Sequence, residues 1–220
     1  MYVLHYAPDT ASLAVRLVLA DLRLPHELRL VDRDGGELAS PAYRALHPLG
    51  KIPVLDTPDG PMFETAAILL YLADRHGHLA PAVGSHERAA FLKWLFFTST
   101  NLHASEMELF YPERVAGPDA VEALLPRAAE RVRFCLTALD QAAAGSPAWM
   151  PADEPSLMGW YLGMLVRWLS TFPPGHPGRI ASAEFPALHR VFAMLEARPA
   201  ALEVAADEGL GPTIFTNPAY

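Results

Sequence analysis

Hydrophobic periodicity changes once along this 220-residue chain, near residue 80. Before that point, short apolar runs typical of strands alternate with runs of helical spacing; after it, only helical spacing recurs. The pattern predicts strands over 2–6, 27–31, 51–56 and 61–63, and helices from residue 12, over 41–46 and over 64–75. The first β-α-β crossover implies parallel strands, and the short turn after Asp56 implies an antiparallel hairpin. We therefore expect an α/β domain over residues 1–80, built on a small mixed sheet.

The rest of the chain is predicted to be an all-helical, all-α domain over residues 86–220, joined to the first by a linker over 79–85. The expected helices span 86–110, 119–144, a stretch that opens at Ser156, and 185–197, with Pro- and Gly-containing segments between them. Ser156 is a residue type that caps helices, but Gly159 stands where a capping box has an acid. The tail over 213–220 is expected to be non-helical. It either drapes over the site or is disordered, and disorder is the preferred interpretation.

Composition excludes several classes of protein. The single cysteine, Cys135, permits no disulfide framework, no C-x-x-C pair and no cysteine-rich zinc site, and it fits a reducing compartment. The formal charge of −8 and the lack of a basic run argue against nucleic acid or an anionic membrane as a partner. No apolar run approaches the ~20 residues of a membrane span, and the N-terminus carries no export signal. We expect a cytoplasmic protein.

Three strings of residues are specific enough to compare with known families. They are HPLGKIPVLDTPDGPMFETAAILLYLADRHG from His47 to Gly77, EPSLMGWYLGMLVRW from Glu154 to Trp168, and FPALHRVFAMLEARPA from Phe185 to Ala200. The first is very similar to the glutathione-site segment of the cytosolic glutathione S-transferases, and the others resemble that family's C-terminal folding motif and last helices. The resemblance is to bacterial, beta-, theta- or zeta-like classes that use Ser or Cys. It implies a thioredoxin-like N-terminal domain that binds glutathione as co-substrate, a helical C-terminal domain and a homodimer.

Glutathione has two carboxylates, one ammonium and one thiol, and the resemblance assigns residues to these groups. Ile52-Pro53 would pair with the cysteinyl backbone like an added strand, through a cis peptide bond that the family implies. The alternative is a trans proline at the start of a strand. Glu64-Thr65 opens a helix whose free amides suit the γ-glutamyl carboxylate; the Thr65 hydroxyl would add a hydrogen bond, and Glu64 would pair with the ammonium. The alternative there is simple helix capping.

Lys51 is placed to reach the glycyl carboxylate, although a solvated surface lysine is an equally good interpretation. His47 is a weaker candidate, because it also closes the preceding helix. His76, His78 and His86 do not predict a metal site, since a helix ends between them and no acid or cysteine completes a ligand set.

The thiol activator is where the chain departs from the family. Aligned on Val15-Arg16, the serine of one class falls at Asp9 and the cysteine of another at Ala11, so neither is present. The hydroxyls of Thr10 and Ser12 remain as donors to a thiolate. For Ser12 an N-capping role is preferred to catalysis, and Thr10 ranks ahead of it as activator. An Asp9 carboxylate that points inward would disfavour the thiolate.

His103 lies in TSTNLHASEMELF, which resembles a helical segment of bacterial members where a histidine sits over the active site. There it would donate to the ligand sulfur or to a substrate group; the alternative is a surface or internally bonded histidine. The residue that follows, Ala104, stands where those members carry Lys. Met107, Phe110 and Tyr111 could wall a pocket for a second substrate, although aromatics at this spacing more often belong to a core.

Two kinds of function are consistent with these residues. In the first, the glutathione thiolate attacks an electrophilic carbon of a hydrophobic substrate between the domains, or the reaction is peroxide reduction, dehalogenation or isomerisation. In the second, the same scaffold is a non-catalytic module that binds glutathione, another ligand or a protein. The absence of Ser and Cys from the usual activator positions favours the second, non-catalytic function. For a homodimer, the helix over 64–75 and the long helix after residue 86 offer faces.

Overall fold

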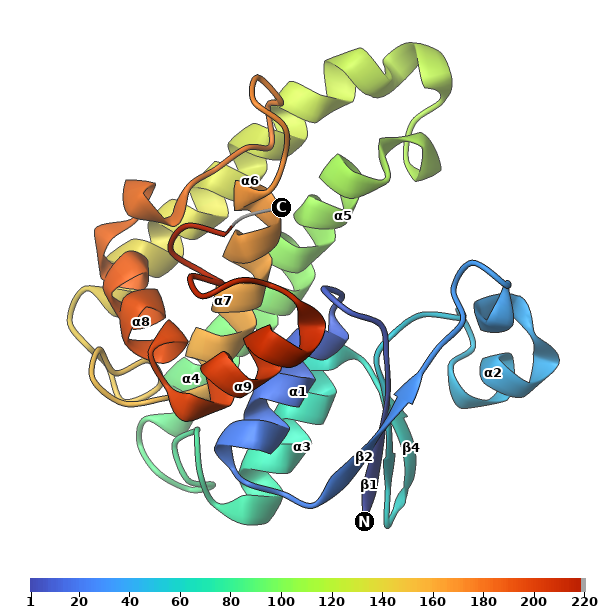
Figure 1. The fold of residues 1–220 in the computed structure, drawn as a ribbon. Helices are drawn as coiled ribbons and strands as arrows, with labels where there is room; N and C mark the ends of the chain where they lie inside the picture. The colour runs from blue at the N-terminus through green and yellow to red at the C-terminus, as the bar shows by residue number, and fades with distance from the viewer. Residues whose placement is uncertain (219–220) are drawn as a thin grey trace.

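The structure, a computed structural model, describes residues 1–218 (Figure 1). The strands of this part of the chain form one mixed sheet in the order β2-β1-β3-β4. They are β1 (Tyr2–Tyr6), β2 (His26–Leu30), β3 (Val54–Thr57) and β4 (Gly60–Phe63). β1 pairs parallel with β2 and antiparallel with β3, and β3 pairs antiparallel with β4, as the periodicity predicts. β3 begins at Val54 rather than at residue 51, which leaves the residues before it outside the sheet.

Helices cover both faces of this sheet. α1 (Ser12–Asp21) and α3 (Thr65–His76) lie between the sheet and the rest of the molecule, and α2 (Pro41–Leu46) lies on the opposite side (Figure 1). Residues 12–19 of α1 are all buried, because the helix packs against α3 and against helices of the C-terminal domain. α2 covers a smaller apolar cluster centred on Val31, Tyr43 and Val54.

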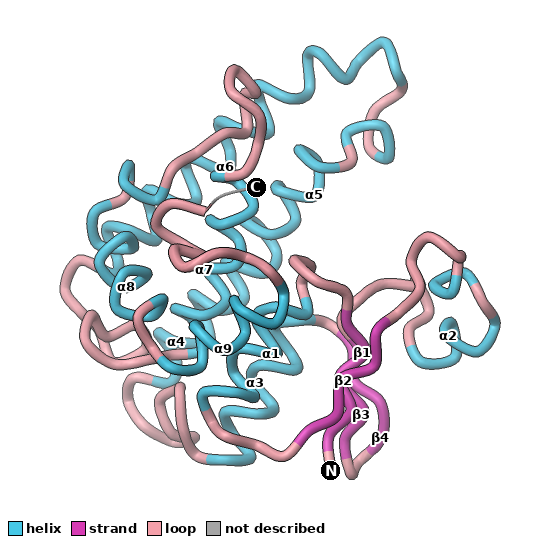
Figure 2. Tube along the Cα trace, viewed as in Figure 1, coloured by secondary structure: helices cyan, strands magenta, loops and turns pink. Residues whose placement is uncertain are grey.

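Beyond residue 80 the described chain is helical, and Figure 2 shows all the strands at one side of the molecule. The helices are α4 (Arg88–Phe97), α5 (Ala104–Phe110), α6 (Val121–Ala143), α7 (Leu157–Ser170), α8 (Pro186–Glu196) and α9 (Pro199–Glu208). α4 and α5 are joined by a π-helical segment, Thr98–His103, so the helix expected over 86–110 is one stretch with an altered pitch in the middle. Single 3-10 turns at Glu37–Ala39, Pro112–Arg114, Pro118–Ala120 and Ser182–Glu184 complete the helical elements. The domain boundary at residues 80–86 stays a prediction.

α7 runs through the centre of the C-terminal domain. Every residue from Leu157 to Leu169 is buried, including Arg167, which is typical of a helix surrounded on all sides. Ser156 caps it as expected, by accepting a hydrogen bond from the Gly159 backbone N–H at 3.1 Å. A side chain at position 159 would meet Leu195 at 2.9 Å, so the packing of α8 accounts for a glycine there.

The C-terminal segment corrects two expectations. α9 was not predicted, because its alanine-rich sequence has few large apolar residues to mark a period. The tail was expected to be disordered, yet Ile214 and Phe215 are buried and the backbone N–H groups of Phe215 and Thr216 donate to the Glu196 carboxylate. The described part of the tail packs on α7, where Arg167 donates to the Ile214 carbonyl and Gly163 lies against the Phe215 ring. The last two residues of the predicted tail, 219–220, lie outside the described residues.

Within residues 1–218, no helix combines the length and apolar character that a bilayer crossing requires.

Candidate functional site

A cleft of about 710 Å³ opens between the two domains, within the range of small-ligand sites. One wall comes from the loops after β1, before β3 and before α3, and the other from the π-helical segment, α5 and α7. The cleft brings together all but one of the residues predicted from the sequence. Those that line it are Thr10, Lys51, Ile52, Pro53, Glu64, Thr65 and His103. Ser12 is fully buried and lies behind the wall.

The segment before β3 presents free backbone groups to the cleft. The Ile52-Pro53 peptide bond is cis, as the resemblance implied, so the trans alternative is wrong. Within the described chain, neither the N–H nor the C=O of Ile52 has a hydrogen-bond partner. The segment is held from behind, where the Tyr43 hydroxyl donates to the Lys51 carbonyl at 3.0 Å and the Ile52 side chain packs on the cluster under α2. An extended ligand therefore finds a donor and an acceptor already exposed.

The start of α3 supplies a second anchor. Glu64 precedes the helix with φ of 72° and ψ of 109°, a left-handed conformation that is costly for a residue with a side chain. Its side chain makes no capping hydrogen bond, and the first turn contains no acid. The simple capping interpretation is therefore wrong, and the first amides of α3 are left without a side-chain partner. These amides and the buried Thr65 face the cleft, where they suit an anion.

Lys51 and His47 flank these two anchors. The Lys51 side chain is exposed at the rim of the cleft. His47 ends α2, is buried against the Phe63 ring, and accepts a hydrogen bond from the Leu49 backbone N–H at 3.2 Å. Burial lowers the pKa of His47; the Glu64 charge opposes this shift and the Lys51 charge adds to it. His47 closes the preceding helix, as expected, and brings no resident positive charge to the cleft.

The loop after β1 carries the two candidate hydroxyls, which contact each other. Thr10 Oγ1 and Ser12 Oγ are 2.8 Å apart, and both lie within hydrogen-bond distance of the Ala7 carbonyl, at 2.8 and 3.0 Å. The helix cap is Ala11, without a side-chain hydrogen bond, so the N-cap interpretation of Ser12 is wrong. The Ala7 carbonyl therefore has two hydroxyl donors, so it would keep the Ser12 donor if the Thr10 hydroxyl turned toward a ligand. A catalytic role for either hydroxyl stays a prediction.

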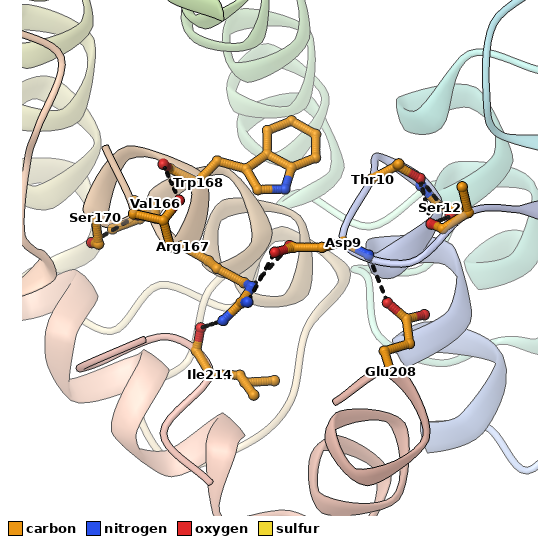
Figure 3. Close-up of polar contacts among 11 residues, drawn as sticks. Asp9, Thr10, Ser12, Val166, Arg167, Trp168, Ser170, Glu208 and Ile214 are labelled. Atoms are coloured by element: carbon orange, nitrogen blue, oxygen red, sulfur yellow. Dashed lines mark hydrogen bonds and ion pairs between the residues drawn. The ribbon is translucent and has the colours of Figure 1, made fainter. Parts of the chain in front are cut away.

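Asp9, at the position that the resemblance aligns with a serine, has its carboxylate turned toward Arg167 of α7. Its carboxylate accepts from Arg167 Nε and Nη2, both at 2.9 Å, and its backbone N–H donates to Glu208 at 2.9 Å (Figure 3). Asp9 lines the cleft, but its carboxylate is paired with the Arg167 guanidinium. Arg167 was missed by the sequence reasoning. The available signal was a charged residue inside an otherwise apolar helix, which requires a buried partner.

His103 belongs to the π-helical segment and faces the cleft. Its Nδ1 lies 2.8 Å from the Tyr161 hydroxyl of α7. Burial, with a smaller contribution from Lys51, lowers the pKa of His103 to about 4, so the ring is neutral near pH 7. Burial also raises the pKa of Tyr161, which keeps its hydroxyl proton. When Tyr161 donates to Nδ1, the His103 Nε2 carries a proton and can donate to a ligand.

The outer part of the cleft has an apolar wall. Met107, Phe110, Tyr111 and Trp168 line it, so Phe110 of α5 and Tyr111 just after that helix are not simply core. Phe110 stacks on Phe172 with ring centroids 4.5 Å apart, which fixes its orientation. A flat hydrophobic group fits such a wall.

This geometry agrees with comparison to known proteins. Residues 11–75 match the family model of the glutathione S-transferase N-terminal domain. The chain is 31% identical over 175 residues to glutathione S-transferase GST-4.5 of Xanthomonas campestris, which covers 75% of this chain and 81% of that protein. It is also 31% identical over 178 residues to the uncharacterized GST-like protein YncG of Escherichia coli, with coverage of 80% and 84%. The chain belongs to the glutathione S-transferase family.

The fold comparison agrees with this assignment. A sphingomonad glutathione S-transferase, solved in complex with glutathione, is 30% identical, with a TM-score of 0.75 over 95% of this chain and 100% of that one. In this glutathione S-transferase the loop after β1 carries an ion pair between Asp9 and the buried Arg167. Among residues 1–218, no three His, Cys, Asp or Glu side chains are grouped as a metal ion requires; His76 instead bonds the Tyr2 hydroxyl at 2.9 Å.

Proposed function

We propose that the protein binds glutathione in this cleft and transfers its thiolate to a hydrophobic electrophile. The observation that carries the proposal is the meeting, in one cleft, of the free Ile52 backbone groups and the uncapped amides of α3. Two anchors of this kind match a peptide that carries a carboxylate at one end.

In the proposed complex each anchor has one task. The Ile52 N–H and C=O pair with the cysteinyl backbone. The amides that open α3, with the Thr65 hydroxyl, bind the γ-glutamyl carboxylate, and Glu64 binds the ammonium. Lys51 reaches the glycyl carboxylate from the rim. The strain at Glu64 is consistent with a functional position, since unfavourable backbone conformations cluster at ligand sites.

The proposed chemistry takes place between Thr10 and the apolar wall. Thr10 turns its hydroxyl from the Ala7 carbonyl to the ligand sulfur, and His103 Nε2 donates to the same sulfur or to the electrophile. A charge-assisted hydrogen bond favours the thiolate over the thiol. The sulfur then forms a bond to carbon while the leaving group departs with the bonding electron pair. The apolar wall holds the electrophile within reach, so that proximity supplies a large part of the acceleration.

Calorimetry and a conjugation assay test this function together. We expect wild-type protein to bind glutathione and to conjugate chlorodinitrobenzene. Lys51→Ala should weaken binding by up to about fivefold, because an ion pair at an exposed rim contributes about 0.2–1 kcal/mol. The matched control is Lys93→Ala, which removes the chain's other lysine, exposed on α4 and outside the cleft. No binding heat from the wild type, or equal losses in both variants, contradicts the proposal.

Thr10→Ala and His103→Gln test the catalytic assignments. Loss of the Thr10 hydroxyl should lower the conjugation rate at least about tenfold while glutathione binding changes little, given the worth of a hydrogen bond to a charged group. Equal rates in Thr10→Ala and wild type would remove Thr10 from the mechanism.

A second candidate function is a non-catalytic binding module. It is favoured by one observation: Asp9 and Ala11 occupy the usual activator positions, and Thr10 already has partners within the loop. In the same assays, glutathione binding by the wild type without any conjugation would identify this function.

We further propose a cytoplasmic homodimer. The single, buried Cys135 suits a reducing compartment. On α3, Ala67, Leu70 and Tyr71 line a shallow depression, and on α4 Phe96 is 56% exposed, so both expected faces carry apolar surface. Light scattering should give twice the 24.0 kDa of one chain, and Leu70→Arg should shift the mass toward one chain. A wild-type mass of one chain contradicts the dimer.

A further inference from the structure

Arg167 is the most deeply buried cation near the loop that carries Thr10. Its side chain is 3% exposed, although it belongs to α7 in the other domain. All three of its nitrogen groups are used: Nε and Nη2 bind the two Asp9 oxygens, and Nη1 donates to the Ile214 carbonyl of the tail at 3.2 Å. A guanidinium that forms a bidentate ion pair with a carboxylate has a fixed orientation.

The same loop is held a second time from α9. The Glu208 side chain is 1% exposed and accepts from the Asp9 backbone N–H. Arg16 of α1 donates to Glu208 at 3.0 Å and also bonds Asp207. Asp9 itself has a φ of 51°, the left-handed region, which these contacts from two elements maintain.

The direction of the Asp9 side chain separates its charge from the adjacent hydroxyl. In Figure 3 the Asp9 carboxylate extends toward Arg167, while Thr10 and Ser12 lie on the other side of the loop. Asp9 is still 35% exposed and contributes to the lining of the cleft. Without Arg167, its negative charge would be uncompensated within the cleft, and a thiolate close by would be disfavoured.

We propose that Arg167 is a positioning residue for the thiol site: it neutralises Asp9, holds that carboxylate against the C-terminal domain, and so places Thr10 beside the sulfur. This inference rests on the proposed binding of glutathione. It makes the C-terminal domain, through α7, part of the thiol site although Arg167 does not touch the ligand. The remaining charged side chains of the cleft are Arg33, Lys51, Glu64, Glu108 and Arg114, and all the test variants keep them.

The test is the pKa of the thiol of bound glutathione, followed by the ultraviolet absorbance of the thiolate as pH is varied. Arg167→Met leaves the Asp9 charge alone and should raise that pKa by about one unit, the effect of a unit charge a few ångströms away in a partly solvated site. Asp9→Asn/Arg167→Met removes both charges and should return the pKa close to the wild-type value. The double variant should also fold more readily than Arg167→Met, because it leaves no charge of the ion pair without a partner.

Two further variants exclude a merely structural effect. Arg198→Met is the matched control, because Arg198 also joins the two domains, through bonds of 2.9 and 3.0 Å to Asp21, but lies outside the cleft. It should leave the thiol pKa unchanged. Asp9→Asn alone leaves the Arg167 cation unpaired and should not raise the thiol pKa. This variant still tests the charge argument when Arg167→Met does not fold.

The outcomes are distinct. The proposal is overturned if Arg167→Met binds glutathione with an unaltered thiol pKa, or if the double variant keeps the raised value. It is also overturned if Arg198→Met or Asp9→Asn raises the pKa as much as Arg167→Met does. A wild-type protein that binds no glutathione overturns the proposed function and this inference together, whereas binding with unchanged thiol pKa values overturns this inference alone.

Discussion

Glu106 is expected to destabilise the protein at neutral pH, and its replacement should reveal by how much. The side chain lies in α5 with no exposed surface, and neither carboxylate oxygen has a hydrogen-bond partner within the described chain. Its charge would act on Cys135 of α6 and Tyr161 of α7. Burial without a compensating cation raises the pKa of Glu106 well above its ordinary value of 4.5.

The sign and size of the effect follow from proton linkage. Below pH 4.5 the carboxyl is protonated in both the folded and the unfolded chain, so it costs nothing in ionisation. Above that pH the unfolded chain releases the proton and the folded chain does not, so stability falls as pH rises toward the folded-state pKa. Each pH unit costs about 1.4 kcal/mol, so the cost at pH 7 lies between about 3 and 3.5 kcal/mol if the folded-state pKa is above 7.

Glu106→Met should therefore stabilise the protein, and increasingly so at higher pH. Methionine has a similar length and no polar group to satisfy. At pH 7 we expect a gain of about 3 kcal/mol, or roughly 6–12 °C in melting temperature for a chain of this size. At pH 4.5 the ionisation part of the gain should vanish. Urea unfolding followed by tryptophan fluorescence, at one protein concentration throughout, measures both values.

The matched control lies two positions along the same helix. Glu108 is paired with Arg131 at the surface, and Glu108→Met should give a small loss of stability, up to about 1 kcal/mol, at every pH. A gain in Glu106→Met that is the same at pH 4.5 and 7 would show a packing effect and refute the ionisation argument. No gain at either pH would refute the uncompensated burial itself.

Two further predictions concern the tail and the cleft. Phe215→Ala should lower the free energy of unfolding by about 3–5 kcal/mol, because a fully buried phenylalanine is lost; Leu202→Ala, 49% exposed, should cost less than about 1 kcal/mol in the same denaturation experiment. His103 should remain neutral down to about pH 4, so the conjugation rate should show no inflection from it near pH 6.5, and His103→Gln should keep the shape of the wild-type profile. By linkage, the low pKa of His103 makes the folded protein lose stability as pH falls from 6.5 toward 4, and His103→Gln should remove that loss.

The half of the cleft for which we propose glutathione binding was predictable because its parts are close together in sequence. Ile52-Pro53 and Glu64-Thr65 lie within one recognisable string, and each exposes backbone groups by a conformation that its own neighbours determine. Strand and helix order in the first domain was predictable for the same reason. The limits of β3 were not, because whether residues 51–53 join the sheet depends on the partner strand and not on their own apolar pattern.

The tail could not be predicted from its own residues. Thr213 to Phe215 contains a threonine and two apolar residues among glycines and prolines, a composition that also suits disorder. Its order depends on a residue far away in the sequence. Gly163 has no side chain and so leaves room for the Phe215 ring; a Cβ at position 163 would lie 3.1 Å from that ring. Hydrogen bonds to Glu196 then secure the backbone.

The loop beside the proposed thiol site could not be predicted for the same reason: contacts with residues distant in the sequence decide its conformation. Asp9 alone predicts a site hostile to a thiolate, and that expectation depends on where one carboxylate points. The direction is decided by Arg167, 158 residues further along the chain, and by Glu208 beyond it. Because a buried arginine requires a partner and a carboxylate beside a thiolate requires neutralisation, each of the two residues is unfavourable without the other. The pair is therefore one unit. Together they hold the loop whose next residue, Thr10, lines the cleft.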